Sequence, residues 1–275
     1  MIVDKILNYL STEGKEIEQS ILDESAKLLV NSFNRQFGVK QESDRVLRLS
    51  SIGKCLRQQA YNILGYEYKG KEIDSRSKMV FFQGDMTELA IIQLAKIAGC
   101  EIMACGSEQE NIELMGVKGH PDGILINEEI DWRPGKWKIK YKYLVEVKSM
   151  SSYSYAEFQE GNIEESYLYQ INAYLEALGL EKCVMVALNK DSGVLGERII
   201  TKDIQIVAKI KENINILNNL MTLPLPERPY SPNEKGFLPW NCNYCKFYIT
   251  CWPNAEKVLV GKSYKLKVRN ETSIP

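Results

Sequence analysis

The segment 144–149 reads Leu-Val-Glu-Val-Lys-Ser and places a carboxylate and an amine two positions apart in a strand-like pattern. Successive side chains of a β-strand point to opposite faces, so Glu146 and Lys148 share one face while Val145 and Val147 share the other. One face can therefore pack in a core while the other presents an acid beside a base. By itself, such a pair is most often an ordinary ion pair on a solvated strand.

A second carboxylate, Asp122, follows the turn 119–121 at the mouth of a neighbouring strand. Asp122 and Glu146 together suit Mg²⁺ or Mn²⁺, because a hard cation takes oxygen ligands and usually needs only one or two carboxylates beside water and phosphate. The backbone carbonyl of Val147 is a further candidate ligand. Such a metal lowers the pKa of a bound water and polarises a phosphate, and Lys148 would orient the water or stabilise charge on the phosphate. This set predicts hydrolysis of a phosphodiester bond.

Three more polar side chains fall on helices that flank these strands. Glu88 lies on a helix predicted over 77–98, before the strands. Gln170 and Tyr174 are four residues apart on a helix predicted over 163–178, so they share one face of it. Each of the three also has a plainer interpretation as a polar position on a helix surface.

Three of the seven cysteines, Cys242, Cys245 and Cys251, form a C-x2-C-x5-C pattern directly after the proline-rich segment 222–240. Thiols this close together in a cytosolic chain indicate metal ligation rather than disulfides. Cys55, at the start of a predicted helix with basic neighbours, is the best candidate for a fourth ligand. Zinc and an iron–sulfur cluster both fit four cysteines, and spacing alone does not decide between them. The remaining cysteines are expected to be buried thiols: Cys100, Cys105 and Cys183.

The composition of the whole chain limits the classes of protein that it fits. Its 275 residues include 35 Lys and Arg and 36 Asp and Glu, so a nucleic-acid partner would need a local basic surface. His120 is the single histidine, which excludes HExxH peptidases and sites built from several histidines. His120 and Glu88 remain candidates for one additional metal ligand. Neither a signal peptide nor a membrane span is found, so we expect a protein of a prokaryotic, archaeal or phage-infected cytoplasm with no membrane partner.

Hydrophobic periodicity and turn residues predict an α/β fold, with a mixed central sheet between helices. Helices are expected over 1–38, 50–64, 77–98, 163–178 and 204–221. Strands are expected over 112–117, 123–126, 143–147, 183–188 and 196–201, with a polar hairpin excursion over 127–142. The chain is expected to divide into a helical region 1–75, a core 76–221, and a cysteine-rich region with a basic tail, 222–275.

In type and order, these residues resemble the RecB-like branch of the PD-(D/E)XK nuclease superfamily, which includes the CRISPR-associated nucleases of the fourth Cas family. In that branch a helix acidic residue or histidine, an Asp after a turn, an E-x-K strand and a Q-x-x-x-Y helix follow one another. The matching positions here are Glu88, Asp122, Glu146, Lys148, Gln170 and Tyr174. The run 119–123, Gly-His-Pro-Asp-Gly, is similar to the family's G-x-x-D-G turn. CRISPR-associated members often have histidine where Glu88 sits, so this chain departs toward the phage exonuclease pattern. The resemblance spans roughly residues 50–252 and rests on motif order.

The resemblance implies a restriction-endonuclease-like core in which those six residues are catalytic. It also implies a [4Fe–4S] cluster on Cys55, Cys242, Cys245 and Cys251, which would join the helical N-terminal region to the C-terminal region. The implied substrate is DNA, single-stranded or with free ends, cut as by an exonuclease. Proteins of recombination, repair or CRISPR systems would be partners.

Two other interpretations stay open at this point. One is an iron–sulfur module that binds DNA or a protein partner on a nuclease scaffold and cleaves little. The other is a zinc-bound structural adaptor.

Overall fold

The structure, a computed structural model, describes residues 1–12, 14, 16–39, 45–67, 75–104, 111–130, 138–261 and 263–269, with only the backbone at 128–130 and 138–139. The described residues form two compact units that interleave along the chain. The first draws on 1–43, 48–53 and 75–212, and the second on 44–47, 54–74 and 213–275. Within the described ranges, no helix is long and apolar enough to cross a membrane.

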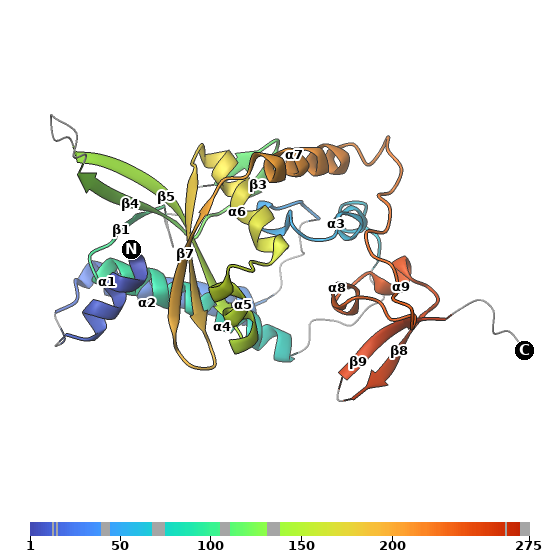
Figure 1. Cartoon of the computed structure of the whole chain (residues 1–275), viewed down its shortest axis with the longest axis horizontal. Coiled ribbons are helices and arrows are strands. Elements are labelled where there is room, and N and C mark those ends of the chain that lie inside the picture. Colours follow the sequence, from blue (N-terminus) through green and yellow to red (C-terminus); the bar gives the residue numbers. More distant parts are fainter. Residues whose placement is uncertain are drawn as a thin grey trace, which may run out of the picture. The chain divides into compact units, whose positions relative to one another are not determined.

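Helices account for much of the first unit (Figure 1). They are α1 (Ile2–Leu10), α2 (Gln19–Phe37), the short 3-10 helix η1 (Leu49–Ser51), α4 (Ser75–Ile97), α5 (Ser152–Glu160) and α6 (Glu165–Leu178). A further helix, α7 (Ile204–Asn218), passes from the first unit into the second. Gly179 ends α6 with a φ of +65°, a conformation that glycine adopts without steric cost. The helical region expected over 1–38 consists of two helices, because α1 ends at Leu10 and α2 begins only at Gln19.

The first unit is built around a mixed five-stranded sheet, as expected. Its strands are β1 (Glu101–Met103), β4 (Gly123–Ile130), β5 (Lys138–Met150), β6 (Lys182–Asn189) and β7 (Leu195–Thr201), in the order β1-β4-β5-β6-β7. β5 and β6 run parallel, and the other neighbours are antiparallel. β5 is therefore the central strand, hydrogen-bonded on both edges.

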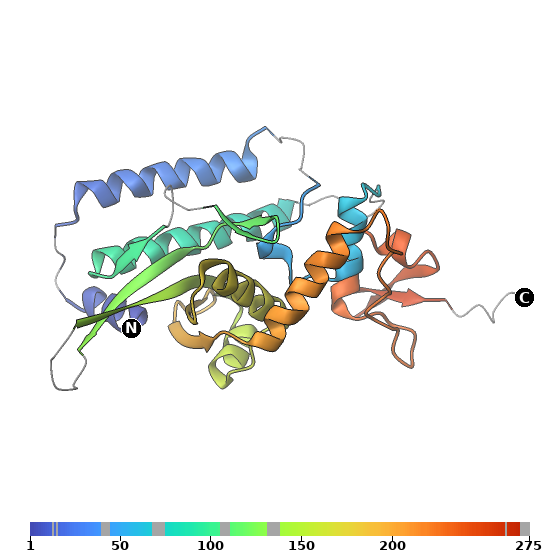
Figure 2. The ribbon, with the colours of Figure 1, turned by 90° about the horizontal axis from the view of Figure 1, so that it is seen from above.

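The alternation of side chains predicted from the sequence means that the two faces of β5 pack against different helical layers. Val145 and Val147 are buried in the core that α4 forms against the sheet. Glu146 points to the opposite face, where α6 lies. Figure 2 shows α2 along the outer side of α4, then the sheet, then α6. Glu146 is thus buried beneath α6, so its pair with Lys148 is not an ordinary ion pair on a solvated strand.

The segment 112–119 differs from the expected single strand over 112–117. It forms a separate two-stranded hairpin, β2 (Ile112–Leu114) and β3 (Val117–Gly119). Its two-residue turn places Met115 at φ +51° and Gly116 at φ +83°. Two positive φ values suit the right-handed twist of a tight hairpin, but methionine is not a residue that signals such a turn. β1 and α5 were also not expected.

The polar excursion expected over 127–142 is the outer part of a long hairpin. β4 and β5 continue to pair through it, from Asn127 opposite Tyr141 to Ile130 opposite Lys138. The tip, 131–137, lies outside the described residues, as does Cys105.

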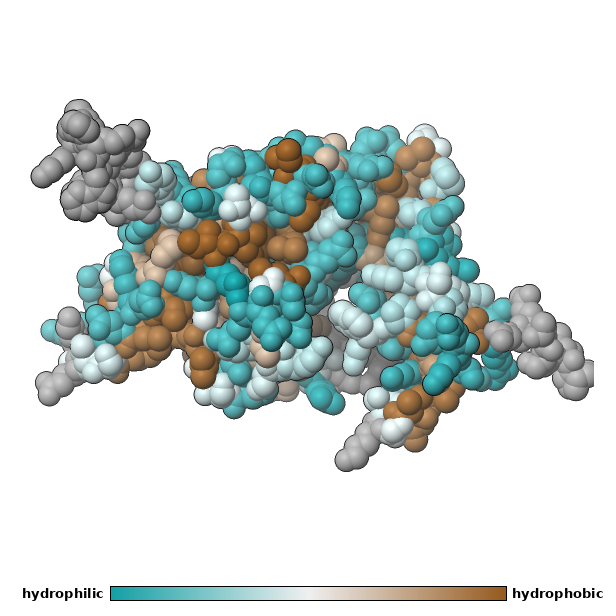
Figure 3. Space-filling view, in the orientation of Figure 1, coloured by the Kyte–Doolittle hydropathy of each residue, from teal (hydrophilic) through white to brown (hydrophobic). Residues whose placement is uncertain are grey.

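The second unit carries the cysteine-rich segment. Its helices are α3 (Leu56–Ile63), α8 (Trp240–Asn243) and α9 (Tyr248–Cys251), and its strands β8 (Ala255–Val260) and β9 (Ser263–Val268) form a hairpin. α3 begins after Cys55, so the expected helix start at 50 is wrong. The basic tail is the β8–β9 hairpin, which buries Leu266 against Leu238 and Cys242. Figure 3 shows hydrophobic atoms exposed near the hairpin tip, where Leu259 is 59% exposed.

We expect Gly119→Ala to lower the free energy of unfolding by about 1–3 kcal/mol. An added Cβ would lie 2.7 Å from Cε1 of Tyr174 and 2.9 Å from Cβ of Leu49, closer than carbon atoms pack. Urea denaturation followed by circular dichroism measures the change. Gly84→Ala in α4 is the matched control, because no atom lies within 4 Å of its added Cβ and alanine favours a helix by about 1 kcal/mol. An equal loss in both variants would contradict the close packing at Gly119.

Candidate active site

The two carboxylates and the lysine predicted from the sequence meet at the centre of the sheet. Asp122 precedes β4, and its Oδ2 accepts a hydrogen bond of 2.8 Å from the backbone N–H of Val147 on β5. Glu146 is 0% exposed, and its Oε1 accepts hydrogen bonds from Lys148 Nζ and from Gln170 Nε2, the latter at 2.8 Å. The hydrogen bond from β5 to Asp122 fixes the turn against the strand, so both carboxylates belong to one rigid element pair.

The other carboxylate oxygen of Glu146, Oε2, is buried and has no hydrogen-bond partner among the described residues. A buried, unpaired carboxylate oxygen is costly, and a cation bound there would remove that cost. Asp122 and Glu146 fit Mg²⁺ or Mn²⁺, which accept two carboxylates and complete their shell with water, backbone carbonyl and phosphate oxygens. Among the described residues, no group of three or more His, Cys, Asp or Glu side chains is placed to hold a metal ion. A metal here would therefore complete its coordination with backbone carbonyl, water and phosphate oxygens.

Three carboxyl groups crowd one another around this point. Burial raises the pKa of Asp122 well above its usual range, and the charges of Glu146 and Glu88 add to the shift. Burial also raises the pKa of Glu88, with Glu146 contributing and Arg35 opposing. For Lys148, burial acts against the charged form, but Glu146 and Asp122 outweigh it and raise the pKa. Lys148 is consequently a stable cation, whereas burial and the neighbouring carboxylates disfavour the charged forms of Asp122 and Glu88.

A cleft of about 520 Å³ opens over these groups in the first unit. Every site residue expected from the sequence lines it: Glu88, His120, Asp122, Glu146, Val147, Lys148, Gln170 and Tyr174. His120 is exposed on the rim. Ser50, Gln83, Ser149 and Lys190 also line the cleft and were not foreseen.

The α6 side chains position the acid rather than exchange protons with it. Gln170 holds one oxygen of Glu146, so the other oxygen has a fixed direction. Tyr174 is 1% exposed and packs on Gly119. Burial, and then the charges of the two carboxylates, raise the pKa of Tyr174, so its hydroxyl stays protonated. Tyr167, which the sequence did not single out, places its ring 5.1 Å from Lys148 Nζ, a cation–π contact.

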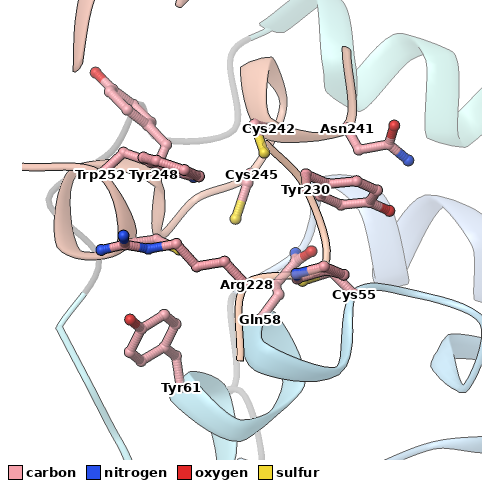
Figure 4. A pocket seen from close by; sticks show the side chains of 12 residues that line it. Cys55, Gln58, Tyr61, Arg228, Tyr230, Asn241, Cys242, Cys245, Tyr248 and Trp252 are labelled. Carbon is pink, nitrogen blue, oxygen red and sulfur yellow. The ribbon is translucent and has the colours of Figure 1, made fainter. Parts of the chain in front are cut away.

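The four cysteines proposed as ligands line one small pocket of the second unit, and Figure 4 labels three of them, Cys55, Cys242 and Cys245. Cys55 comes from the start of α3, and the other three come from segment 242–251. Backbone N–H groups of α3 hydrogen-bond the Cys55 sulfur, and the N–H of Phe247 does so at Cys245. These contacts are of the kind that tune a thiolate bound to a metal.

Burial is the largest influence on these thiols. It raises the pKa of Cys55, and together with the neighbouring cysteines it raises the pKa of Cys242 to about 12 and that of Cys245 to about 11. Without a bound metal these three thiols are therefore protonated at neutral pH. Cys100 and Cys183 are buried in the first unit, as expected for small apolar side chains.

Comparison with known proteins gives distant structural likenesses. No family model matches the sequence, and no curated protein matches it. The crystal structure of SSO0001 is similar over 82% of this chain and 95% of that one, with 17% identity and a TM-score of 0.45. An alkaline exonuclease from Laribacter hongkongensis is similar over 70% and 92%, with 14% identity and a TM-score of 0.44. A phage-related exonuclease from Haemophilus somnus is similar over 62% and 91%, with 15% identity and a TM-score of 0.40. Likenesses of this size do not assign a family or an activity to the chain.

We expect Asp122→Asn to raise the melting temperature of the protein in EDTA. The substitution removes a negative charge from a crowded buried group, while the asparagine oxygen can still accept the hydrogen bond from Val147. Mg²⁺ should then stabilise the wild type, by about 2.7 kcal/mol at a hundredfold excess over Kd, and leave the variant unchanged. Differential scanning fluorimetry with EDTA and with MgCl₂ measures both effects. A variant that melts below the wild type in EDTA would show that repulsion between Asp122 and its neighbouring carboxyl groups does not destabilise the protein.

Proposed function

We propose that this chain is a Mg²⁺- or Mn²⁺-dependent deoxyribonuclease of the PD-(D/E)XK type, which hydrolyses phosphodiester bonds in the cleft above β5. The supporting observation is the buried Glu146 oxygen that has no partner, next to Asp122 and the cationic Lys148. Few purely structural sites combine an unpaired buried carboxylate oxygen with an open cleft. A cation that enters the cleft would bind the unpaired oxygen of Glu146, and a phosphate would pair with the charge of Lys148.

In this proposal each side chain has a separate task. Asp122 and Glu146 would hold the metal, with the carbonyl of Val147 as a third ligand, while Glu88 and His120 line the same cleft. When bound, the metal supplies an activated water and polarises the phosphate. Lys148 stabilises negative charge that develops on the phosphate, because its neighbours keep it protonated. Gln170 keeps the free oxygen of Glu146 directed at the metal.

The preference for single-stranded DNA or DNA ends, and for exonucleolytic cutting, rests on the resemblance of the motif order to RecB-like nucleases. Cleavage of 5′- and 3′-labelled single-stranded, duplex and circular DNA tests that preference. If circular DNA is cut as fast as linear DNA, the protein is a nuclease but does not require a free end, and the exonuclease assignment is wrong.

We expect Glu146→Gln and Lys148→Met to lower the cleavage rate by about 100-fold or more, as loss of a group that stabilises transition-state charge does. DNA binding, measured by fluorescence anisotropy, should change little. Glu176→Gln is the matched control, since this carboxylate pairs with Lys211 and Lys202 away from the cleft and should cleave at the wild-type rate. Wild-type cleavage by Glu146→Gln, or full activity in EDTA, would overturn the assignment.

We further propose that the pocket of Cys55, Cys242, Cys245 and Cys251 binds a [4Fe–4S] cluster. All four thiols line one pocket, and three of them belong to the C-x2-C-x5-C segment 242–251. The choice of a cluster over zinc rests on the resemblance of this cysteine pattern to that of the CRISPR-associated nucleases. The cluster would tie α3 to segment 242–251 across a long stretch of sequence, which stabilises the second unit by closing a long loop.

Iron and sulfide analysis of anaerobically purified protein should give about four irons per chain, as four-cysteine ligation of such a cluster requires. Cys245→Ala should lose the colour and most of the iron and should melt at a lower temperature. Cys183→Ala is the control, because this thiol is buried in the first unit, and it should keep the colour. One zinc per chain with no sulfide would refute the cluster and favour the zinc adaptor.

A further inference from the structure

The charged side chains that line the catalytic cleft are mostly acidic among the described residues. The carboxylates are Asp85, Glu88, Asp122 and Glu146. The lysines are Lys148 and Lys190, and Lys148 is already hydrogen-bonded to Glu146. Because a DNA strand is negatively charged along its whole length, such a cleft repels it unless a further cation meets its phosphates. Lys190 can supply that charge, and the proposed metal chemistry makes no use of it.

The ammonium group of Lys190 is accessible. The residue is exposed, and within the described ranges no carboxylate lies within ion-pair distance of it. Its neighbour Asp191 is directed at α5, where its Oδ2 accepts hydrogen bonds from the backbone N–H and the hydroxyl of Ser152, at 2.7 and 2.9 Å. These two bonds lower the pKa of Asp191 most, and the charge of Lys190 adds a smaller part. Lys190 can therefore exchange its water for a phosphate oxygen without breaking an ion pair.

The backbone that carries Lys190 is held from two sides. Its N–H donates a hydrogen bond of 2.9 Å to the carbonyl oxygen of Met150, at the end of β5. The preceding Asn189 accepts hydrogen bonds at Oδ1 from the N–H of Asp191 and from the hydroxyl of Ser152, at 3.1 and 3.3 Å. These bonds join the turn after β6 to the central strand and to α5. The side chain of Lys190 thus starts from a fixed point of the cleft wall.

The register of the sheet sets how far Lys190 lies from the proposed reaction. Lys148 on β5 is opposite Ala187 on β6, so Lys190 lies beyond its level by about 10 Å, at about 3.3 Å per residue. The ammonium group of Lys148 turns back to Glu146, which is farther still from Lys190. The two lysines therefore serve different phosphates. One strand can reach both, since its phosphates follow one another at about 3.4 Å of helix axis in a duplex.

We propose that Lys190 binds a phosphate farther along the strand than the reacting one, so that the cleft selects a polynucleotide over a simple phosphodiester. The inference rests on the proposed nuclease for the reacting phosphate and adds Lys190 as a positioning residue. A contact of this kind fixes where the strand lies and carries no preference for base sequence. Lys190 takes no part in the chemical step, so its charge acts on KM and not on kcat.

Lys190→Met tests the proposal, because methionine keeps an unbranched side chain and removes the charge. Fluorescence anisotropy with a labelled single-stranded oligonucleotide in EDTA measures Kd while no strand is cut. We expect Kd to rise about fivefold at low salt, and the slope of log Kd against log salt to fall by about 0.7, the share of one phosphate in a single strand. In MgCl₂, KM should rise by a similar factor and kcat should stay the same. Lys182→Met is the matched control, because this exposed lysine begins β6 at the end away from the cleft, and it should bind as wild type does.

Oligonucleotides in which one phosphate is replaced by a neutral methylphosphonate locate the contact. Wild type should lose about fivefold in affinity at one position beside the reacting linkage, and Lys190→Met should lose nothing further there, as expected for two groups that contact each other. An unchanged Kd and salt slope in Lys190→Met, or an equal methylphosphonate effect in variant and wild type, would overturn the proposal.

These outcomes separate the failure of the contact from the failure of the proposed function. If the protein cuts DNA and Lys190→Met binds and cuts as wild type does, the nuclease stands and the phosphate contact is wrong. If Lys190→Met loses affinity and salt dependence but the wild type cuts no DNA, the contact stands and the nuclease is wrong.

Discussion

The burial of one carboxylate, Glu146, constrains most of the first unit. A charged side chain at 0% exposure on the central strand is stable only if its neighbours neutralise it. Lys148 does this from the same strand face, Gln170 adds a hydrogen bond from α6, and the ring of Tyr167 makes a cation–π contact with Lys148. The second oxygen of Glu146 is left out of this arrangement. Folding and the proposed chemistry therefore meet at one atom, because the Glu146 oxygen that lacks a hydrogen-bond partner among the described residues is the one that a cation can bind.

This constraint explains why the carboxylate stands on β5 and not on an edge strand. A strand paired on both sides has no freedom to shift, so the direction of Glu146 is set by the register with β4 and β6. The bond from Val147 N–H to Asp122 uses the same backbone to hold the second carboxylate. Gly119 also contributes, because its lack of a side chain leaves room for the ring of Tyr174 to pack against the backbone that leads to Asp122. The positions of the acids follow from backbone geometry more than from loop conformation.

The sequence was enough to predict the parts of the fold that follow a period. Alternation placed Glu146 and Lys148 on one face, and helical spacing brought Gln170 and Tyr174 to the same cleft. The predictions of helix and strand bounds were wrong where local sequence signals conflict with tertiary structure. Met115 takes a positive φ that nothing in its side chain favours, so the β2–β3 hairpin was read as one strand. α3 starts at Cys55 without a side-chain cap, whereas the serines before it suggested an earlier start. Lys190 follows β6 and reaches the cleft only through the packing of the sheet, which no spacing rule expresses. Tyr167 lies three residues before Gln170 on the same face of α6, so helical spacing could have identified it.

The attachment of α2 has a consequence for how the first unit opens. Ser32 is the single residue of this 19-residue helix that is buried among those described, and the helix meets α4 through the ion pair of Asp85 and a cluster of Phe33, Phe37 and Phe82. Regions with few buried apolar side chains open at a lower free energy than the core around them. α2 can thus detach as a cooperative segment while the sheet and its carboxylates remain folded. Amide hydrogens of α2 should accordingly exchange with solvent through a local opening, on a faster timescale than those of β5. The rate at which a molecule enters the space between α2 and α4 is then set by a helix that takes no part in the proposed chemistry.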